Sequence, residues 1–136
     1  MSEMAPVRTL IVEDYDEFRN FLRLTLQKAA QYVVIGEAVD GMQAVEKAEE
    51  LQPDLILLDL SLPKLNGMEA LRRIRKLSPH SKVVILSQDS SPEIVQGALR
   101  LGAVGYLLKS DANNLPQALD AVVQGTVFVS PRLKSS

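Results

Sequence analysis

The sequence has 136 residues, of which 46% are hydrophobic, and a formal net charge of −2 at pH 7. This length predicts one domain, and the slightly acidic balance gives no electrostatic basis for direct binding of nucleic acid or an anionic membrane. The absence of cysteine excludes a disulfide framework and thiolate metal ligands. No apolar run approaches the roughly 18 residues of a transmembrane helix, and the first ten residues lack the pattern of a signal peptide, so we expect a cytoplasmic protein.

The first half of the chain alternates between short apolar runs and amphipathic segments. The run VRTLIV (residues 7–12) predicts a strand, and an apolar stripe at helical spacing predicts a helix over residues 16–30. A second strand is expected over residues 33–38. Asp40, with Gln43 three residues later, has the pattern of a capping box that opens a second helix.

The second half continues this alternation. The same signals predict strands over residues 54–59, 82–86 and 105–108, and helices after Asn66, after Ser91 and over residues 115–124, the last capped by Asn113 or Asn114. The third and fourth strands are continuous apolar runs, which is typical of strands buried on both faces. Five β-α units with short links predict an α/β fold with a doubly wound, flavodoxin-like, five-stranded parallel sheet and helices on both faces.

Chemically reactive side chains stand where four of the expected strands end. Glu13 and Asp14 follow the first strand, Asp59 ends the third, Ser87 follows the fourth, and Lys109 follows the fifth. In such sheets, ligand sites lie beyond the carboxyl ends of the strands. Three clustered carboxylates stay ionised together only where a cation compensates, and Mg²⁺ prefers carboxylate and phosphate oxygens. With the lysine and the hydroxyl, this site could accept a phosphoryl group on Asp59 as an aspartyl phosphate.

Four motifs, VEDYDEFR, LILLDLSLPKLNG, VVILSQD and GAVGYLLK, occur in this order and span nearly the whole chain. In order and spacing they resemble the CheY-like receiver domains of bacterial two-component response regulators. The resemblance implies the doubly wound five-stranded fold and phosphotransfer from a cognate sensor histidine kinase. It further implies Mg²⁺ as the cofactor, with Mn²⁺ as an alternative, and a self-phosphorylating acceptor in place of a turnover enzyme.

The resemblance also implies roles for individual residues. The phosphoacceptor is Asp59, which acts as a catalytic residue together with Lys109. The implied metal ligands are Glu13, Asp14, Asp59 and the main-chain carbonyl of Ser61. The implied phosphoryl-binding and switch residues are Ser87, Lys109 and Tyr106. Phosphorylation would draw the hydroxyl toward the new charge and turn the tyrosine inward, which would reshape the face of the fourth helix, fifth strand and fifth helix.

The segments GAVGYLLKS and GTVFVSPRL resemble receivers of the LuxR/NarL-type transcription regulators, which carry a helix-turn-helix domain after the receiver. We expect a leader over residues 1–6, the receiver over residues 7–125, and a tail or the start of a linker over residues 126–136. Because the tail resembles the start of a linker, we expect an excised receiver in preference to a stand-alone one. DNA would be bound only through an absent C-terminal domain. A second copy of the chain is a candidate partner, and a membrane is not.

Three other functions fit the residues less well. A receiver-like scaffold that takes no phosphate would not need the acids together with Lys109. A nucleotide- or flavin-binding domain would carry a glycine-rich loop after the first strand, where this chain has acids. A metal-dependent phosphatase would need a second acid near its nucleophile, at the place of Ser61.

Tyr106 and Gln88 stand close to the expected site. Tyr106 is explained equally well by packing in a short strand and by a role in switching. Gln88 stands directly after the switch hydroxyl, and we expect its bulk to restrict the access of small phosphoryl donors.

Overall fold

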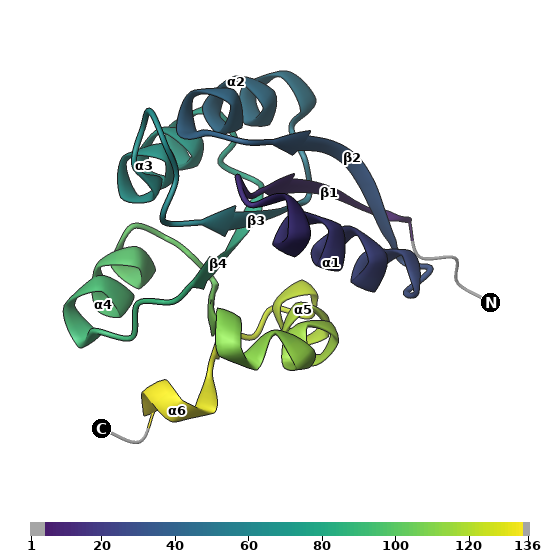
Figure 1. Cartoon of the computed structure of the whole chain (residues 1–136). Coiled ribbons are helices and arrows are strands. Elements are labelled where there is room, and N and C mark those ends of the chain that lie inside the picture. The colour runs from purple at the N-terminus through teal and green to yellow at the C-terminus, as the bar shows by residue number, and fades with distance from the viewer. Residues whose placement is uncertain (1–4, 135–136) are drawn as a thin grey trace.

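The computed structural model describes residues 5–134, in which strands and helices alternate from end to end (Figure 1). The elements in chain order are β1 (Val7–Val12), α1 (Asp16–Gln27), β2 (Tyr32–Ala38), α2 (Gly41–Leu51), β3 (Leu55–Asp59), α3 (Gly67–Leu77), β4 (Lys82–Ser87), α4 (Pro92–Arg100), β5 (Gly105–Leu108), the 3₁₀ segment η1 (Lys109–Asn114), α5 (Leu115–Val123), β6 (Phe128–Val129) and α6 (Pro131–Lys134). The five expected β-α units are therefore confirmed, with helix ends that move by a few residues.

The strands form one parallel sheet in the order β2-β1-β3-β4-β5-β6. The order reverses direction between β1 and β3, which makes the sheet doubly wound, as expected. The expected count of five strands was wrong by one, because Phe128 and Val129 pair with Gly105 and Tyr106 at the edge of the sheet. This short strand depends on the free edge of β5, which no local pattern reveals.

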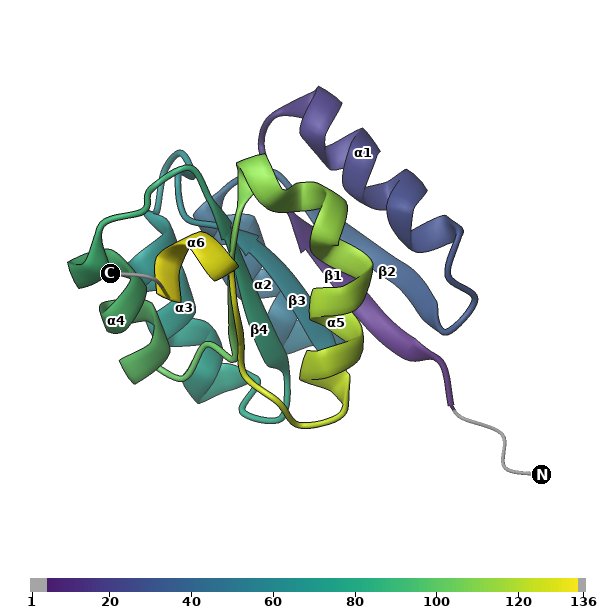
Figure 2. The same ribbon diagram turned by 90° about the horizontal axis from the view of Figure 1, so that it is seen from below.

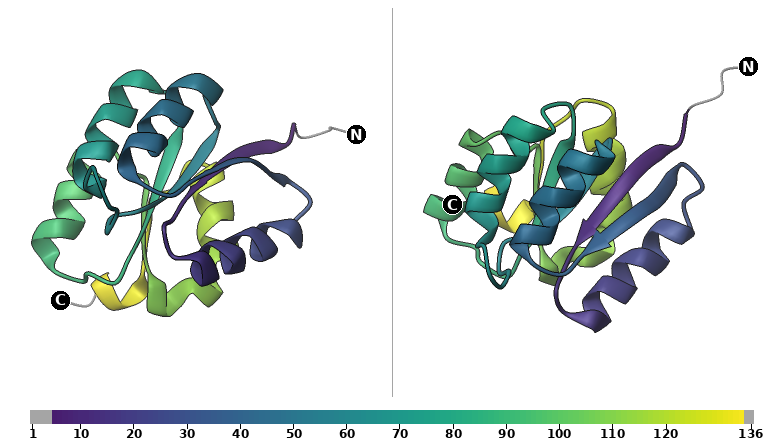
Figure 3. Two further views of the ribbon diagram at one scale, coloured as in Figure 1. Left: turned by 45° about the horizontal axis from the view of Figure 1, so that its top comes forward. Right: turned by 90° about the horizontal axis from the view of Figure 1, so that it is seen from above.

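Helices cover both faces of the sheet. Figure 2 shows α1 and α5 on one face, and the right panel of Figure 3 shows α2 and α3 in front of the other, with α4 beside them. The two layers of core follow the alternation of β3: Leu55 and Leu57 pack with α1 and α5, whereas Ile56 and Leu58 pack with α2, α3 and α4. All five residues of β3 are buried, and each large apolar side chain so buried contributes about 1.5–3 kcal/mol.

Two of the expected helix caps are present, and two are not. Asp40 Oδ1 accepts a hydrogen bond from Gln43 N at 2.8 Å, and Gln43 Oε1 accepts one from Val39 N at 3.0 Å, so the reciprocal bond of this capping-box variant reaches the residue before the cap. The Asn66 side chain likewise accepts from the nitrogen of the third residue after it. The side chains of Ser91 and Asn114 make no cap hydrogen bond. The 3₁₀ segment η1 directly precedes α5, so the chain enters α5 already in a helical conformation.

The residues after α5 pack against the sheet edge. Ser130 is fully buried between β6 and α6, and Leu133 of α6 packs against the core on the α2–α4 side. Pro131 stands at the first position of α6, where a proline needs no hydrogen-bond donor. Among residues 5–134, no helix has the length and the apolar character to cross a membrane.

Candidate functional site

Three carboxylates converge where the strand order reverses. Glu13 and Asp14 directly follow β1, Asp59 ends the neighbouring strand β3, and one carboxylate oxygen of each lies within 4.8 Å of the others. Glu13 and Asp59 are 0% and 2% exposed, and Asp14 faces solvent. The cluster thus occupies the carboxyl edge of the sheet at its switch point, the position at which open α/β sheets bind their ligands.

Lys109 reaches this cluster from the far side of β4. It follows β5, and its ammonium lies 3.1 Å from Glu13 Oε1 and 3.5 Å from Asp59 Oδ2. The lysine side chain is only 16% exposed, so these charges are poorly screened by water. The structure therefore brings together the three acids and the lysine that the sequence placed at the ends of three different strands.

Glu13 is electrostatically strained by its surroundings. Burial raises the pKa of its carboxyl group, the negative charge of Asp59 raises it further, and Lys109 partly offsets both effects. Its Oε2 accepts hydrogen bonds from Lys109 Nζ at 3.3 Å and Tyr15 N at 3.1 Å. Its Oε1 is buried and accepts none, because the nearby ammonium is not aligned for one. This buried anionic oxygen therefore has an ion-pair partner but no hydrogen bond, and it is of the type that a hard divalent cation binds.

The acids open into a cleft of about 380 Å³. Ser61 lines this cleft, and its main-chain nitrogen donates to Asp59 Oδ1 at 3.0 Å, which fixes the carboxylate orientation. The cleft is lined by Glu13, Asp14, Tyr15, Asp59, Ser61, Gln88 and Lys109. Gln88 is exposed and lies at the cleft wall, so a phosphoryl donor entering there would pass its side chain.

Ser87 and Tyr106 do not line this cleft; they share a partner behind it. Ser87 Oγ accepts a hydrogen bond from Asp89 N at 2.9 Å, and the Tyr106 hydroxyl donates to the carbonyl oxygen of Asp89 at 2.6 Å. Tyr106 is fully buried, and this burial raises its pKa. We expected the tyrosine to move inward after phosphorylation, but its ring already occupies the inward position here.

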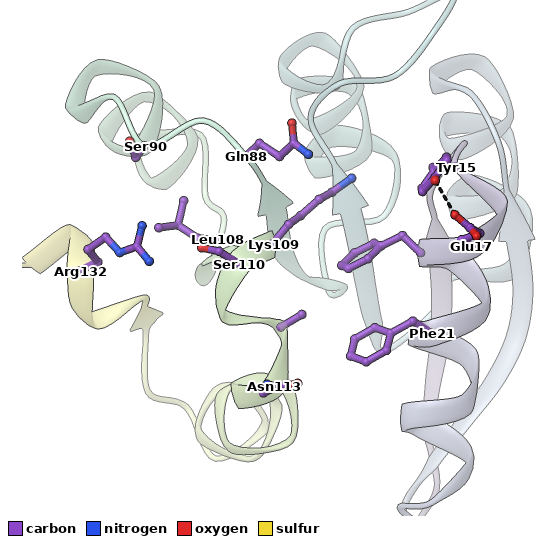
Figure 4. A pocket seen from close by; sticks show the side chains of 12 residues that line it. Tyr15, Glu17, Phe21, Gln88, Ser90, Leu108, Lys109, Ser110, Asn113 and Arg132 are labelled. Atoms are coloured by element: carbon purple, nitrogen blue, oxygen red, sulfur yellow. Dashed lines mark hydrogen bonds between the residues drawn. The ribbon is translucent and has the colours of Figure 1, made fainter.

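Phe18 is a contact of the site that the sequence did not single out. The sequence marks it only as part of the apolar stripe of α1, yet the Lys109 ammonium lies 4.8 Å from the centroid of its ring. The ring also lines a second cleft of about 690 Å³, formed by the start of α1, by η1 and by α6. Figure 4 shows Lys109 and Gln88 at the boundary of this second cleft, with Phe21 facing it from α1. Both clefts share Tyr15, Gln88 and Lys109.

A doubly wound parallel sheet with three acids, a hydroxyl and a lysine at its carboxyl edge defines the class of receiver domains. The chain matches the response regulator receiver domain family over residues 9–120 and belongs to this family.

Comparison with known proteins shows which receivers this chain is similar to in sequence and structure. It is 38% identical over 134 residues to the nitrate/nitrite response regulator protein NarL of Escherichia coli K12, covering 98% of this chain and 62% of NarL. It is 37% identical over 125 residues to the transcriptional regulatory protein YdfI of Bacillus subtilis 168, covering 91% of this chain and 58% of YdfI. A crystal structure of a LuxR-family two-component response regulator from Aurantimonas sp. SI85-9A1 superimposes with a TM-score of 0.89 at 31% identity, covering 95% of this chain and 93% of that one. The resemblance to LuxR/NarL-type receivers is confirmed, and the chain spans about three fifths of the length of NarL and YdfI.

Proposed function

We propose that this receiver is a phosphorylation-gated switch in which Asp59 accepts a phosphoryl group from a sensor histidine kinase. The observation that carries the proposal is the surroundings of Asp59. Its carboxylate is 2% exposed at the end of β3, has the Lys109 ammonium 3.5 Å from Oδ2, and lies beside two further carboxylates. A scaffold would gain nothing from holding three acids and a lysine together in one cleft, because such a cluster costs folding stability.

We assign a divalent cation, Mg²⁺ or alternatively Mn²⁺, to Glu13, Asp14, Asp59 and the main-chain carbonyl of Ser61. The all-oxygen donor set and the buried Glu13 Oε1 without a hydrogen bond support this assignment. When bound, the cation would neutralise the carboxylates and stabilise negative charge on the phosphoryl oxygens.

The transfer itself needs one nucleophile and one cationic side chain. A carboxylate oxygen of Asp59 attacks the phosphorus atom, and the new P–O bond forms as the P–N bond to the kinase phosphohistidine breaks. The imidazole leaves with the bonding electron pair and takes up a proton from solvent. Ser61 N holds Asp59 Oδ1 in place, and Lys109 pairs with a phosphoryl oxygen after the transfer.

The response would start at Ser87. In this structure its Oγ accepts a hydrogen bond from Asp89 N, and a phosphoryl oxygen on Asp59 would accept the proton of the same hydroxyl. Rotation of the hydroxyl would release the loop between β4 and α4, and this loop is also tied to Tyr106 through the Asp89 carbonyl. Because the tyrosine ring is already inward, we assign the movement to the loop and to the α4–β5–α5 face, as a shift between two states.

The output of this switch lies outside the receiver. We propose transcription control through a C-terminal DNA-binding domain, with the segment after residue 125 as the start of the connection, a second copy of the chain as a candidate partner, and a cytoplasmic location. The support is the likeness to YdfI, a transcriptional regulatory protein that is longer than this chain.

Intact-mass measurement tests the phosphoacceptor directly. The protein is incubated with acetyl phosphate, and separately with a phosphorylated histidine kinase, each with and without Mg²⁺. We expect a gain of about 80 Da that requires Mg²⁺ and is absent in Asp59→Asn. A folded wild-type protein that gains no mass from either donor would overturn the proposal and favour the scaffold.

A further inference from the structure

The Lys109 ammonium has a third partner besides its two carboxylates. It lies 4.8 Å from the centroid of the Phe18 ring, within the roughly 6 Å over which a cation is attracted to the face of an aromatic ring. The lysine side chain is only 16% exposed, so water competes weakly and the attraction is stronger than at an open surface.

The ring is held firmly relative to the acids. Phe18 lies in the first turn of α1 and stacks on Phe21, with ring centroids 5.6 Å apart and planes 24° from parallel. The next residue, Arg19, donates a hydrogen bond to the main-chain carbonyl of Glu13 at 3.0 Å. The start of α1 is thereby attached to the same short segment that carries two of the three carboxylates, which holds the ring close to the lysine.

The ring differs from the carboxylates in how it responds to a bound cation. The attraction of Glu13 and Asp59 for the ammonium falls once a divalent cation neutralises them, and the cation itself repels the lysine. The Phe18 ring carries no net charge to be neutralised. The second cleft, lined by both Lys109 and Phe18, offers an open space of about 690 Å³ into which an unheld lysine could swing.

We propose that Phe18 is a positioning residue for Lys109: its ring keeps the ammonium beside Asp59 when the acids hold a divalent cation. The inference rests on the proposed function, because it concerns the lysine that is to meet the phosphoryl group. Under this proposal the first turn of α1 contributes to the phosphotransfer reaction as well as to the hydrophobic core.

Side-chain NMR tests the contact without relying on activity. Protons above an aromatic ring are shifted upfield, so the Lys109 ε-methylene signals are followed as Mg²⁺ is added to the full chain. We expect an upfield shift in the wild type that persists at saturating Mg²⁺, persists in Phe18→Tyr, and is lost in Phe18→Leu. Phe21→Leu is the control for loss of a ring in the same cleft: the cation–π contact of the ammonium is with Phe18, and the Arg19–Glu13 hydrogen bond still holds the start of α1 in this variant.

The rate of aspartyl phosphate formation at saturating Mg²⁺ gives the second measurement. We expect Phe18→Leu to slow it about threefold to tenfold, the range for a partly desolvated cation–π contact. Phe18→Tyr and Phe21→Leu should stay within about twofold of the wild type, and the Mg²⁺ dissociation constant should be similar in all four proteins.

Two results would overturn the inference. One is a Lys109 signal that is equally shifted in Phe18→Leu, or that loses its shift in the wild type once Mg²⁺ binds. The other is an equal loss of rate in Phe18→Tyr and Phe18→Leu, which would mean that packing alone is at stake. Failure of the proposed function would appear separately, as a wild type without an adduct, and the NMR measurement in the metal-free protein would still decide whether ring and lysine are in contact.

Discussion

The hydroxyl of Ser130 accepts a hydrogen bond from the main-chain nitrogen of Leu108 at 2.9 Å. The nitrogen of Ser130 in turn donates to the carbonyl of Tyr106, also at 2.9 Å. Both partners belong to β5, and Leu108 directly precedes Lys109. The short segment that follows α5 is therefore fastened to the strand that carries Tyr106 and leads directly into Lys109.

Ser130→Ala tests this fastening. The substitution leaves the buried Leu108 N–H without its acceptor, so we expect the free energy of unfolding to fall by about 1–3 kcal/mol. Urea denaturation measures the loss, and amide exchange at Leu108 should accelerate. Ser110→Ala, at an exposed position, is the control and should change stability by less than about 0.5 kcal/mol. If Ser130→Ala is as stable as this control, the Ser130 hydroxyl does not contribute to the free energy of unfolding.

Glu13→Gln tests the electrostatic strain in the acid cluster. Burial and the charge of Asp59 raise the pKa of Glu13, which means that its ionised form costs stability at neutral pH. Without a divalent cation at pH 7, we expect the variant to melt a few degrees above the wild type. Mg²⁺ should then raise the melting temperature of the wild type much more than that of the variant, because the cation relieves a charge that the variant lacks.

Asp14→Asn provides the comparison for this prediction. Asp14 is exposed, so its charge should cost little stability without metal, although its loss should also weaken the response to Mg²⁺. Calorimetric melting of the three proteins, with and without Mg²⁺, separates burial from metal binding. A metal-free Glu13→Gln protein that melts below the wild type would mean that the contact with Lys109 outweighs the strain.

Glu37 gives the protein a predictable response to acid. Its carboxylate lies 2.6 Å from Arg23 Nε and 3.1 Å from Arg19 Nε. The hydrogen bond from Arg23 is the largest influence, and together the two guanidinium groups lower the pKa of Glu37 below its ordinary 4.5. A lowered folded-state pKa means that the stabilisation is present above pH 4.5 and is lost as the pH falls through the folded-state value.

Glu37→Gln should therefore cost up to about 1 kcal/mol at pH 7, the range for partly exposed ion pairs. The gap between variant and wild type should narrow as the pH is lowered from 5 to 3, because protonation removes the same charge from the wild type. Urea denaturation at several pH values measures this gap, and added salt should shrink it at pH 7. A gap that stays constant across this pH range would assign the effect to packing of the side chain.

Most of the fold could be predicted from the sequence, because the patterns that indicate strands and helix caps involve residues close together in the chain. The continuous apolar run 55–58 ends at Asp59, and a strand buried on both faces has this pattern wherever it occurs. Given parallel strands in a doubly wound order, the acids and Lys109 had to meet at one edge. The capping box at Asp40 was equally readable, since both of its partners lie within three residues.

What the sequence did not reveal depends on contacts between distant segments. Strand β6 forms at the free edge of β5; Phe128 and Val129 are residue types that favour strands, but a pairing of two residues is too short to be predicted from the sequence pattern. The inward state of Tyr106 depends on the carbonyl of Asp89, 17 residues away. The place of Phe18 beneath Lys109 joins α1 to the end of β5, and a stripe of apolar residues cannot distinguish such a contact from ordinary core packing.

The start of α2 presses against the loop that follows Asp59. A Cβ atom added to Gly41 would lie 2.0 Å from the carbonyl oxygen of Leu65, and Gly41 N donates to the carbonyl of Pro63 at 3.2 Å. Any side chain at this position must push the loop away. The same loop carries Ser61, whose main chain is assigned to the metal site, so the glycine connects helix packing to metal binding.

Gly41→Ala should accordingly reduce the free energy of unfolding by about 1–3 kcal/mol, as overpacking does elsewhere, and should weaken Mg²⁺ binding although residue 41 lines neither cleft. Gly97→Ala is the matched control: its new Cβ would meet only the flexible end of Met68, at 3.2 Å. Since alanine favours a helix interior over glycine by up to about 1 kcal/mol, this control should be neutral or stabilising and should bind Mg²⁺ normally. Urea denaturation and calorimetric Mg²⁺ titration measure both effects. If Gly41→Ala is destabilised but binds Mg²⁺ as tightly as Gly97→Ala, the loop between Asp59 and α3 yields without disturbing Ser61, and the metal site does not depend on the start of α2.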